Sequence, residues 1–217
     1  MDQLTFKFPF KTTYFEKDFY VSSNNFNAYK LIEEWNKLSN KNINIFGPKG
    51  CGKTHLSNIF LKKIDSFIID AKDLNENQLK ILKIKKCIII DNYQNNIDEK
   101  LLYSILNQSK QVENYVVINS IPSIKQLIFN LKDLQSRMNS FIHIGIELPT
   151  DDLLQVIISK SFSEKQINLN PKISDYIIKN VERSYEKMFK FLKDMDELSL
   201  STGKSININL IKKVLDQ

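Results

Sequence analysis

The sequence lacks a hydrophobic stretch long enough to cross a bilayer. Its longest apolar runs, such as the one at 87–91, are far shorter than the roughly 20 residues that a spanning helix needs. The first ten residues lack the basic segment and long apolar segment of a secretory signal. Only two cysteines occur, Cys51 and Cys87, without metal-ligand spacing or a disulfide pattern. We therefore expect a cytoplasmic protein without a membrane segment.

Long blocks of one charge sign are also missing. The 217 residues carry a net charge of +6, but the charges are spread along the chain. A solvated mixed surface explains this spread better than a dedicated DNA-binding face, so direct DNA binding is expected to be weak or absent. The hydrophobic content of 42% suits one full domain, or a larger domain with a small one.

The spacing of apolar residues alternates between helical and strand patterns over most of the chain, without repeats. The expected helices cover 26–38, 54–64 and 98–111, and the expected strands cover 42–46, 66–70, 85–91, 115–120 and 140–148. Such alternation favours an α/β fold with a parallel sheet. On the last strand, His143 faces away from the isoleucines and is expected to be a surface or hydrogen-bonded residue, not a ligand.

The pattern changes at Pro149. From Asp151 onward the apolar spacing is helical throughout, with expected helices over 151–165, 171–180, 182–200 and near 208–215. The sequence therefore predicts a small all-helical domain after the α/β domain.

Residues 47–54 read GPKGCGKT, a full match to G-x-x-x-x-G-K-[ST] between an expected strand and an expected helix. The glycines let backbone N–H groups turn toward phosphate oxygens, and the helix N-terminus adds partial positive charge. Lys53 can reach the β- and γ-phosphates, and Thr54 can offer its hydroxyl to Mg2+. We expect ADP or ATP with Mg2+ to contact Gly47, Pro48, Lys49, Gly50, Cys51, Gly52, Lys53, Thr54 and His55.

An acidic partner for this loop is expected at the end of another apolar strand. Asp91 follows Cys87 and three isoleucines, and it is the candidate that completes the Mg2+ shell with Thr54. The next residue is Asn92, where many ATPases of this layout have an acid that polarises the attacking water. An amide cannot accept that proton, so we expect nucleotide binding with weak or no intrinsic ATPase activity.

Together these motifs resemble those of the AAA+ ATPases of the DnaA clade, from YFEKDFYV near the N-terminus to IKKVL at the C-terminus. The resemblance implies an AAA+ P-loop domain with a parallel five-stranded sheet over 13–149, and a helical lid domain over 150–217. It also implies that Phe19 and Val21 flank the adenine. The strand end VVINS stands at the sensor 1 position, where Asn119 or Ser120 is the polar candidate.

The same resemblance assigns roles to two arginines. LKDLQSRMNS at 131–140 resembles the family's box VII, which makes Arg137 an arginine finger for nucleotide on a neighbouring subunit. An arginine suits this role because its fixed charge can stabilise the γ-phosphate as it leaves. ERSYEKMFKFL resembles the sensor 2 segment, in which Arg183 would contact phosphates of the chain's own nucleotide.

An AAA+ unit behind a short N-terminal peptide resembles the Hda-type regulators, which inactivate the initiator DnaA. A full DnaA would add a partner-binding domain before this unit and a helix-turn-helix domain after it, and neither is expected here. Residues 1–12 resemble the glutamine-led peptide by which Hda-type proteins dock on the sliding clamp, with Gln3, Leu4, Phe6 and Phe8 as contacts. From the residues alone, the alternation also fits an edge strand on the protein's own core.

The resemblance implies a regulator that docks on the clamp and promotes hydrolysis of DnaA-bound ATP through Arg137. A helicase-loader-like or DnaA-like ATPase acting on DNA or a replication partner is the alternative, and it predicts turnover by the isolated chain. A scaffold with a vestigial loop is a third reading, opposed by Lys53, Thr54 and Asp91. A homo-oligomer is compatible with each of these readings.

Overall fold

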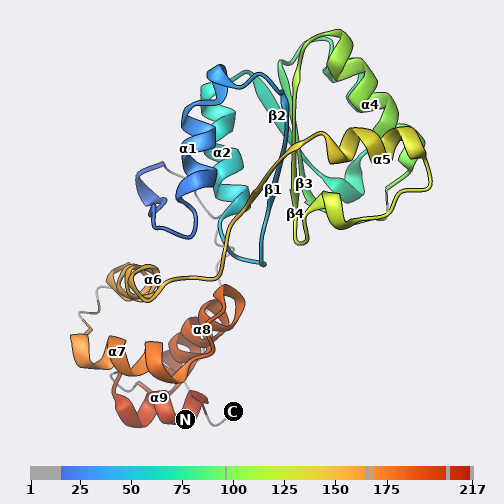
Figure 1. The fold of residues 1–217 in the computed structure, drawn as a ribbon. Coiled ribbons are helices and arrows are strands. Elements are labelled where there is room, and N and C mark those ends of the chain that lie inside the picture. The colour runs from blue at the N-terminus through green and yellow to red at the C-terminus, as the bar shows by residue number, and fades with distance from the viewer. Residues whose placement is uncertain (1–15, 96, 165–166, 168, 204–205, 216–217) are drawn as a thin grey trace. The chain divides into compact units, whose positions relative to one another are not determined.

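The computed structural model describes residues 16–95, 97–164, 167, 169–203 and 206–215. These residues form two compact units, of which the first ends at Glu147 and the second begins at Leu148 (Figure 1). Within these ranges, no helix has the length and apolar character needed to span a bilayer.

A parallel sheet of five strands forms the centre of the first unit, in the order β2-β3-β4-β1-β5. The strands are β1 (Asn42–Phe46), β2 (Ser66–Asp70), β3 (Cys87–Tyr93), β4 (Tyr115–Ser120) and β5 (Ile142–Gly145). Nearly every residue of β3 and β4 is buried, as expected for central parallel strands rich in valine and isoleucine. The prediction of a parallel five-stranded sheet is therefore confirmed.

Helices cover both faces of this sheet, with α1 and α2 on one face and α4 and α5 on the other (Figure 1). The helices of this unit are α1 (Phe26–Glu33), α2 (Lys53–Lys63), α3 (Asn77–Ile81), α4 (Glu99–Gln111) and α5 (Lys132–Asn139), with 3-10 helices at Glu16–Asp18, Trp35–Lys37, Ala71–Asp73 and Ile124–Gln126. One hydrophobic core joins the second face to the sheet. It includes Leu102 and Ile105 of α4, and Leu134 and Met138 of α5. Burial of these side chains fixes α4 and α5 against each other.

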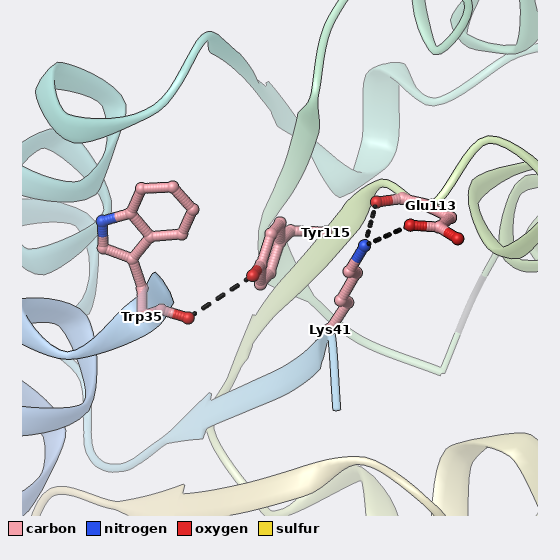
Figure 2. Close-up of polar contacts among 4 residues, drawn as sticks. All are labelled: Trp35, Lys41, Glu113 and Tyr115. Carbon is pink, nitrogen blue, oxygen red and sulfur yellow. Dashed lines mark hydrogen bonds and ion pairs between the residues drawn. The ribbon is translucent and has the colours of Figure 1, made fainter. Parts of the chain in front are cut away.

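The helix expected over 26–38 is broken at Glu34. A 3-10 turn follows, and the Trp35 ring makes edge contacts with Phe60 and Tyr115, at 5.9 and 5.4 Å between ring centroids. The Tyr115 hydroxyl donates a hydrogen bond to the Trp35 carbonyl (3.4 Å; Figure 2). Packing of the half-buried indole against these rings thus overrides helix propensity, which is a weak preference.

The last strand is also shorter than the expected 140–148. His143 lies on β5, and its Nδ1 is 3.2 Å from Ser123 Oγ and 3.3 Å from Asn44 Oδ1. Burial lowers the pKa of His143, which favours the neutral ring. The expectation of a hydrogen-bonded histidine is met at Nδ1, whereas the buried Nε2 has no hydrogen-bond partner among the described residues.

The second unit is helical in the part that the structure describes. Its helices are α6 (Asp151–Ser163), α7 (Pro171–Asn180), α8 (Tyr185–Thr202) and α9 (Ile208–Leu215). Side chains cap three of them, because Thr150, Asn170 and Ser184 accept hydrogen bonds from the first-turn N–H groups of α6, α7 and α8. A separate hydrophobic core holds these helices together. This agrees with the predicted all-helical region.

Candidate functional site

The loop between β1 and α2 has two glycines that other residues could not replace without strain. Gly47 has φ 154°, and a Cβ there would lie 2.5 Å from the Ile146 carbonyl oxygen. Gly52 has φ 100° and stands directly before α2, where a Cβ would lie 3.0 Å from the Phe19 ring. No side chain caps α2 at Gly52. The first N–H groups of α2 are therefore available to an anion.

Lys53, the first residue of α2, folds back across this loop. Its ammonium donates to the carbonyl oxygens of Gly47 (2.7 Å) and Pro48 (3.0 Å) and lies 3.7 Å from Cys51 Sγ. Burial raises the pKa of the Cys51 thiol, so this side chain is a neutral packing group. The ammonium is held over the loop by neutral acceptors, which phosphate oxygens can replace with stronger charge-assisted bonds.

Thr54 and Asp91 come together although 37 residues separate them. Thr54 Oγ1 donates to Asp91 Oδ2 at 2.7 Å, and the other carboxylate oxygen accepts from Asn119 Nδ2 at 2.9 Å. Asn119 Nδ2 also donates to Ser57 Oγ at 2.7 Å. The ends of β3 and β4 are thereby tied to the start of α2, directly beside the loop.

These groups fit a nucleotide with Mg2+. Hydroxyl and carboxylate oxygens are the ligands that Mg2+ prefers, and Thr54 and Asp91 present one of each in contact. Asn119 is fully buried, and its Oδ1 has no hydrogen-bond partner among the described residues. A buried acceptor of this kind normally requires a partner, and a metal-bound water would supply one. Ser57 and the bridging position of Asn119 between Ser57 and Asp91 were not predicted from the sequence. These contacts depend on the order of the strands in the sheet, which the local sequence pattern does not encode.

Asn92, the residue after Asp91, faces another carboxylate. Its backbone is left-handed (φ 57°), and its Nδ2 donates to Asp70 Oδ2 at 2.8 Å. The hydrogen bond from Asn92, followed by one from the Lys72 N–H, lowers the pKa of Asp70. Asp70 was not among the predicted site residues. It is brought here by the register that pairs Asp70 of β2 with Asp91 of β3.

The segment expected to flank the adenine lies against the start of α2. The Phe19 ring stacks on Tyr29 (5.8 Å between centroids) and meets His55 edge-on (5.2 Å). Val21 is half-buried. Two buried asparagines hold this segment, and neither was predicted from the sequence because no local motif marks them. The Asn25 side-chain amide donates a hydrogen bond to the Tyr20 carbonyl, and its oxygen accepts one from the Ser22 N–H. The Asn24 side-chain amide donates to the Glu147 carbonyl.

Arg137 lies away from this loop. It is in the last turn of α5, with its guanidinium carbon 5.0 Å from the centroid of the Tyr103 ring. It lines a polar surface cavity of about 740 Å³ together with residues at the starts of β1 and β4, among them Asn42 and Asn114. The cavity also includes Lys41, whose ammonium is bound by the Glu113 carboxylate at 3.1 Å and carbonyl at 2.9 Å (Figure 2).

Arg183 belongs to the second unit. It precedes the first residue of α8 by two positions and forms an exposed ion pair with Asp151, the first residue of α6. Its contact with the chain's own nucleotide stays a prediction. The predicted clamp contacts, Gln3, Leu4, Phe6 and Phe8, lie outside the described residues.

Comparison with known proteins identifies the relatives of this chain. Residues 151–215 match the family model of the Hda lid domain. The chromosomal replication initiator protein DnaA of Buchnera aphidicola subsp. Cinara cedri is 27% identical over 88% of this chain and 49% of its own length. The chain thus spans about half of that relative. An uncharacterised protein of Haemophilus influenzae is 22% identical over 92% of each chain.

Solved structures share the fold. Domain III of the Thermotoga maritima replication initiation protein DnaA matches with a TM-score of 0.79 and 20% identity, over 96% of this chain and 98% of that one. A replication initiator DnaA bound to AMPPCP and single-stranded DNA matches with a TM-score of 0.71 and 21% identity, over 88% and 66%. The solved structures show that the fold is shared, and the lid match over residues 151–215 together with the DnaA relatives supports a DnaA/Hda-type AAA+ protein.

Proposed function

We propose that this chain binds ADP or ATP and regulates replication initiation by promoting the hydrolysis of ATP bound to DnaA. The observation that carries the proposal is the position of Arg137. It shares a cavity with Asn42, where β1 begins, whereas the phosphate loop follows Phe46, where β1 ends. Four residue steps along a strand span about 13 Å. Arg137 therefore lies near the N-terminal ends of the strands, whereas the chain's own phosphate loop lies at their C-terminal ends. A nucleotide on another molecule is the better target.

Arginine is suited to such a target. Its charge is permanent, and its planar N–H donors match phosphate oxygens two at a time. In phosphoryl transfer, an arginine supplied by a second molecule stabilises the charge that develops on the transferred group. The 31 basic residues of the chain include only two arginines, Arg137 and Arg183. Arg137 is therefore not simply one member of a basic surface.

The chain's own site is proposed to hold nucleotide without rapid turnover. Lys53 would exchange its two loop carbonyls for phosphate oxygens, and Thr54 and Asp91 would orient the Mg2+ shell. A bound Mg–nucleotide would supply a cation for the Thr54 and Asp91 oxygens and phosphate oxygens for the Lys53 ammonium. Asn92 stands where many such ATPases have the acid that polarises the attacking water. Its side-chain amide donates a hydrogen bond to Asp70 and cannot accept a proton from that water.

Docking on the sliding clamp is proposed to bring Arg137 to DnaA. The support is the sequence of the N-terminal segment, in which Leu4, Phe6 and Phe8 would share one side of an extended chain and Gln3 could add a directional hydrogen bond. Each buried apolar anchor is worth about 1.5–3 kcal/mol before the cost of ordering the chain. A micromolar affinity follows from this balance.

The test is the ATPase activity of DnaA in the presence of clamp loaded on DNA. The parent chain should stimulate hydrolysis, and Arg137→Ala should return it to the rate of DnaA alone. Arg137→Lys is the matched control because it keeps the charge but loses the planar fork, and we expect it to recover little activity. Full stimulation by Arg137→Ala would contradict the proposal.

The tether is tested separately by a clamp pull-down. A variant with Gln3→Ala and Phe6→Ala should lose clamp binding and clamp-dependent stimulation, while keeping its thermal stability. Clamp binding equal to that of the parent would rule out docking through this segment, without affecting the role of Arg137.

A further inference from the structure

We propose that Tyr103 and Glu99, one helical turn apart on α4, are positioning residues that hold α5 and direct the Arg137 side chain toward its target. The inference rests on the proposed role of Arg137 as a residue that acts on a partner's nucleotide. It adds two residues that support Arg137, and neither belongs to a phosphate-binding motif.

Tyr103 provides the contact with the guanidinium. The Arg137 guanidinium carbon lies over the Tyr103 ring at 5.0 Å from its centroid, and both side chains are half-buried. A cation over an aromatic face is attracted by the quadrupole of the ring, more strongly where water is partly excluded. Among the described residues, the guanidinium N–H groups donate no hydrogen bond.

This form of contact matters for the chemistry. A carboxylate partner would occupy the N–H donors of Arg137 and neutralise its charge. This ion pair would have to break before a phosphate could bind. The Tyr103 ring uses only the charge, so it restricts the side chain while the in-plane donors stay available for phosphate oxygens. The cavity around Arg137 is open to solvent, so a partner's phosphate could approach it.

Glu99 holds the other end of α5. Its Oε1 accepts from the Asn130 N–H (2.9 Å) and side-chain amide (3.2 Å), and its Oε2 accepts from the Leu131 N–H (2.8 Å). Leu131 is at the N-cap position of α5 and cannot cap the helix itself. The hydrogen bonds from Asn130 and Leu131 lower the pKa of Glu99, so the carboxylate stays charged at neutral pH.

Both contacts come from one face of α4. Glu99 and Tyr103 are four residues apart and therefore lie one above the other on the helix. Leu134 and Met138 are fully buried and fix the backbone of α5 between these two points. The end of α5 is secured by Ser140, whose hydroxyl donates to the Arg137 carbonyl at 2.7 Å. With the backbone fixed, the remaining freedom is that of the Arg137 side chain, which Tyr103 restricts.

The experiment compares Tyr103→Leu, which removes the ring, with Tyr103→Phe, which keeps it. Because the chain has only two arginines, the arginine Nε–H region of a nitrogen–proton NMR spectrum contains two signals, which Arg183→Lys assigns. The ring should shift the Arg137 signal in the parent and in Tyr103→Phe, and the shift should vanish in Tyr103→Leu. In Glu99→Ala, the Asn130 and Leu131 amides should exchange faster with solvent.

The same variants are measured in the DnaA ATPase assay with loaded clamp. Tyr103→Leu should lower the maximal stimulated rate by about 3- to 30-fold, the range for a cation–ring contact from exposed to desolvated, and should leave the half-stimulating concentration unchanged. Tyr103→Phe should restore the rate. A merely structural role would instead lower the thermal midpoint of Tyr103→Leu and would not give this split between rate and concentration.

The outcomes separate the two proposals. If Arg137→Ala abolishes stimulation but Tyr103→Leu does not reduce it, the positioning role is wrong and the proposed function stands. An unchanged Arg137 signal in Tyr103→Leu also overturns the positioning role. If Arg137→Ala leaves stimulation intact, the proposed function fails and the positioning role fails with it.

Discussion

The contact between Asn92 and Asp70 predicts that an acid at position 92 will destabilise the α/β unit unless Asp70 is changed with it. In Asn92→Asp, the amide that donates to Asp70 Oδ2 at 2.8 Å is replaced by a second carboxylate. Two unit charges 4 Å apart repel by about 1 kcal/mol in bulk water and about 4 kcal/mol at an effective dielectric constant of 20. Asn92 is exposed, so the lower part of this range applies, about 1–2 kcal/mol.

The expected result is a less stable α/β unit at neutral pH. A loss of about 1–2 kcal/mol corresponds to a fall in thermal midpoint of about 2–8 °C for a chain of this size. In Asn92→Asp, repulsion raises the pKa of the carboxyl pair, so the loss is present above the ordinary aspartate range and disappears as the pH falls below about 4. The backbone is not the cause, since aspartate also tolerates the left-handed conformation of Asn92.

A double variant makes the reasoning specific. Asp70→Asn with Asn92→Asp exchanges the amide and the acid, restores one hydrogen bond, and should recover most of the stability. The coupling energy of the cycle should be about 1–2 kcal/mol. Asn92→Gly is the control, because it removes the amide without adding charge and accepts a positive φ. An Asn92→Asp variant as stable as the parent at pH 7, or a cycle without coupling, would refute this account.

Two further predictions concern the loop. Lys53→Ala should weaken binding of a fluorescent ADP or ATP analogue by about 10- to 100-fold, since charge-assisted bonds are worth about 1.5–3 kcal/mol. Lys83→Ala, which removes the same charge elsewhere, should not, and equal affinities for the two variants would contradict the role of Lys53. Gly47→Ala should cost about 2–4 kcal/mol in urea unfolding, because a Cβ would lie 2.5 Å from a carbonyl oxygen on a backbone with φ 154°. Gly203→Ala, with φ 63° and no atom within 4 Å of the added Cβ, should cost only about 1–2 kcal/mol, and a larger loss there than at Gly47 would contradict the steric argument.

Local patterns in the sequence predicted the elements that carry the site, but not the contacts between them. The GPKGCGKT loop between β1 and α2, and Asp91 at an apolar strand, follow from motif and periodicity, because neighbouring residues determine both. The hydrogen bonds that join Asn92 to Asp70 and Asn119 to Ser57 depend on strand order and register, which no local pattern specifies. The Tyr103–Arg137 contact likewise depends on how α4 packs on α5.

The same limit explains the misplaced boundaries. Periodicity alone extends the first helix to residue 38, whereas packing of Trp35 against Phe60 and Tyr115 ends it at Glu33. The five-residue helix α3 was not predicted, since Asn77–Ile81 is too short to show a helical period. Tertiary packing decides such positions.

The central claim is that this chain acts on nucleotide held by another molecule. The most direct measurement is a single-turnover assay in which labelled ATP is placed either on DnaA or on this chain, with clamp loaded on DNA. We predict that label on DnaA is converted rapidly to ADP by the parent and not by Arg137→Ala, while label on this chain is converted slowly in both. Rapid conversion of label on this chain, with no dependence on Arg137 for label on DnaA, would contradict the account.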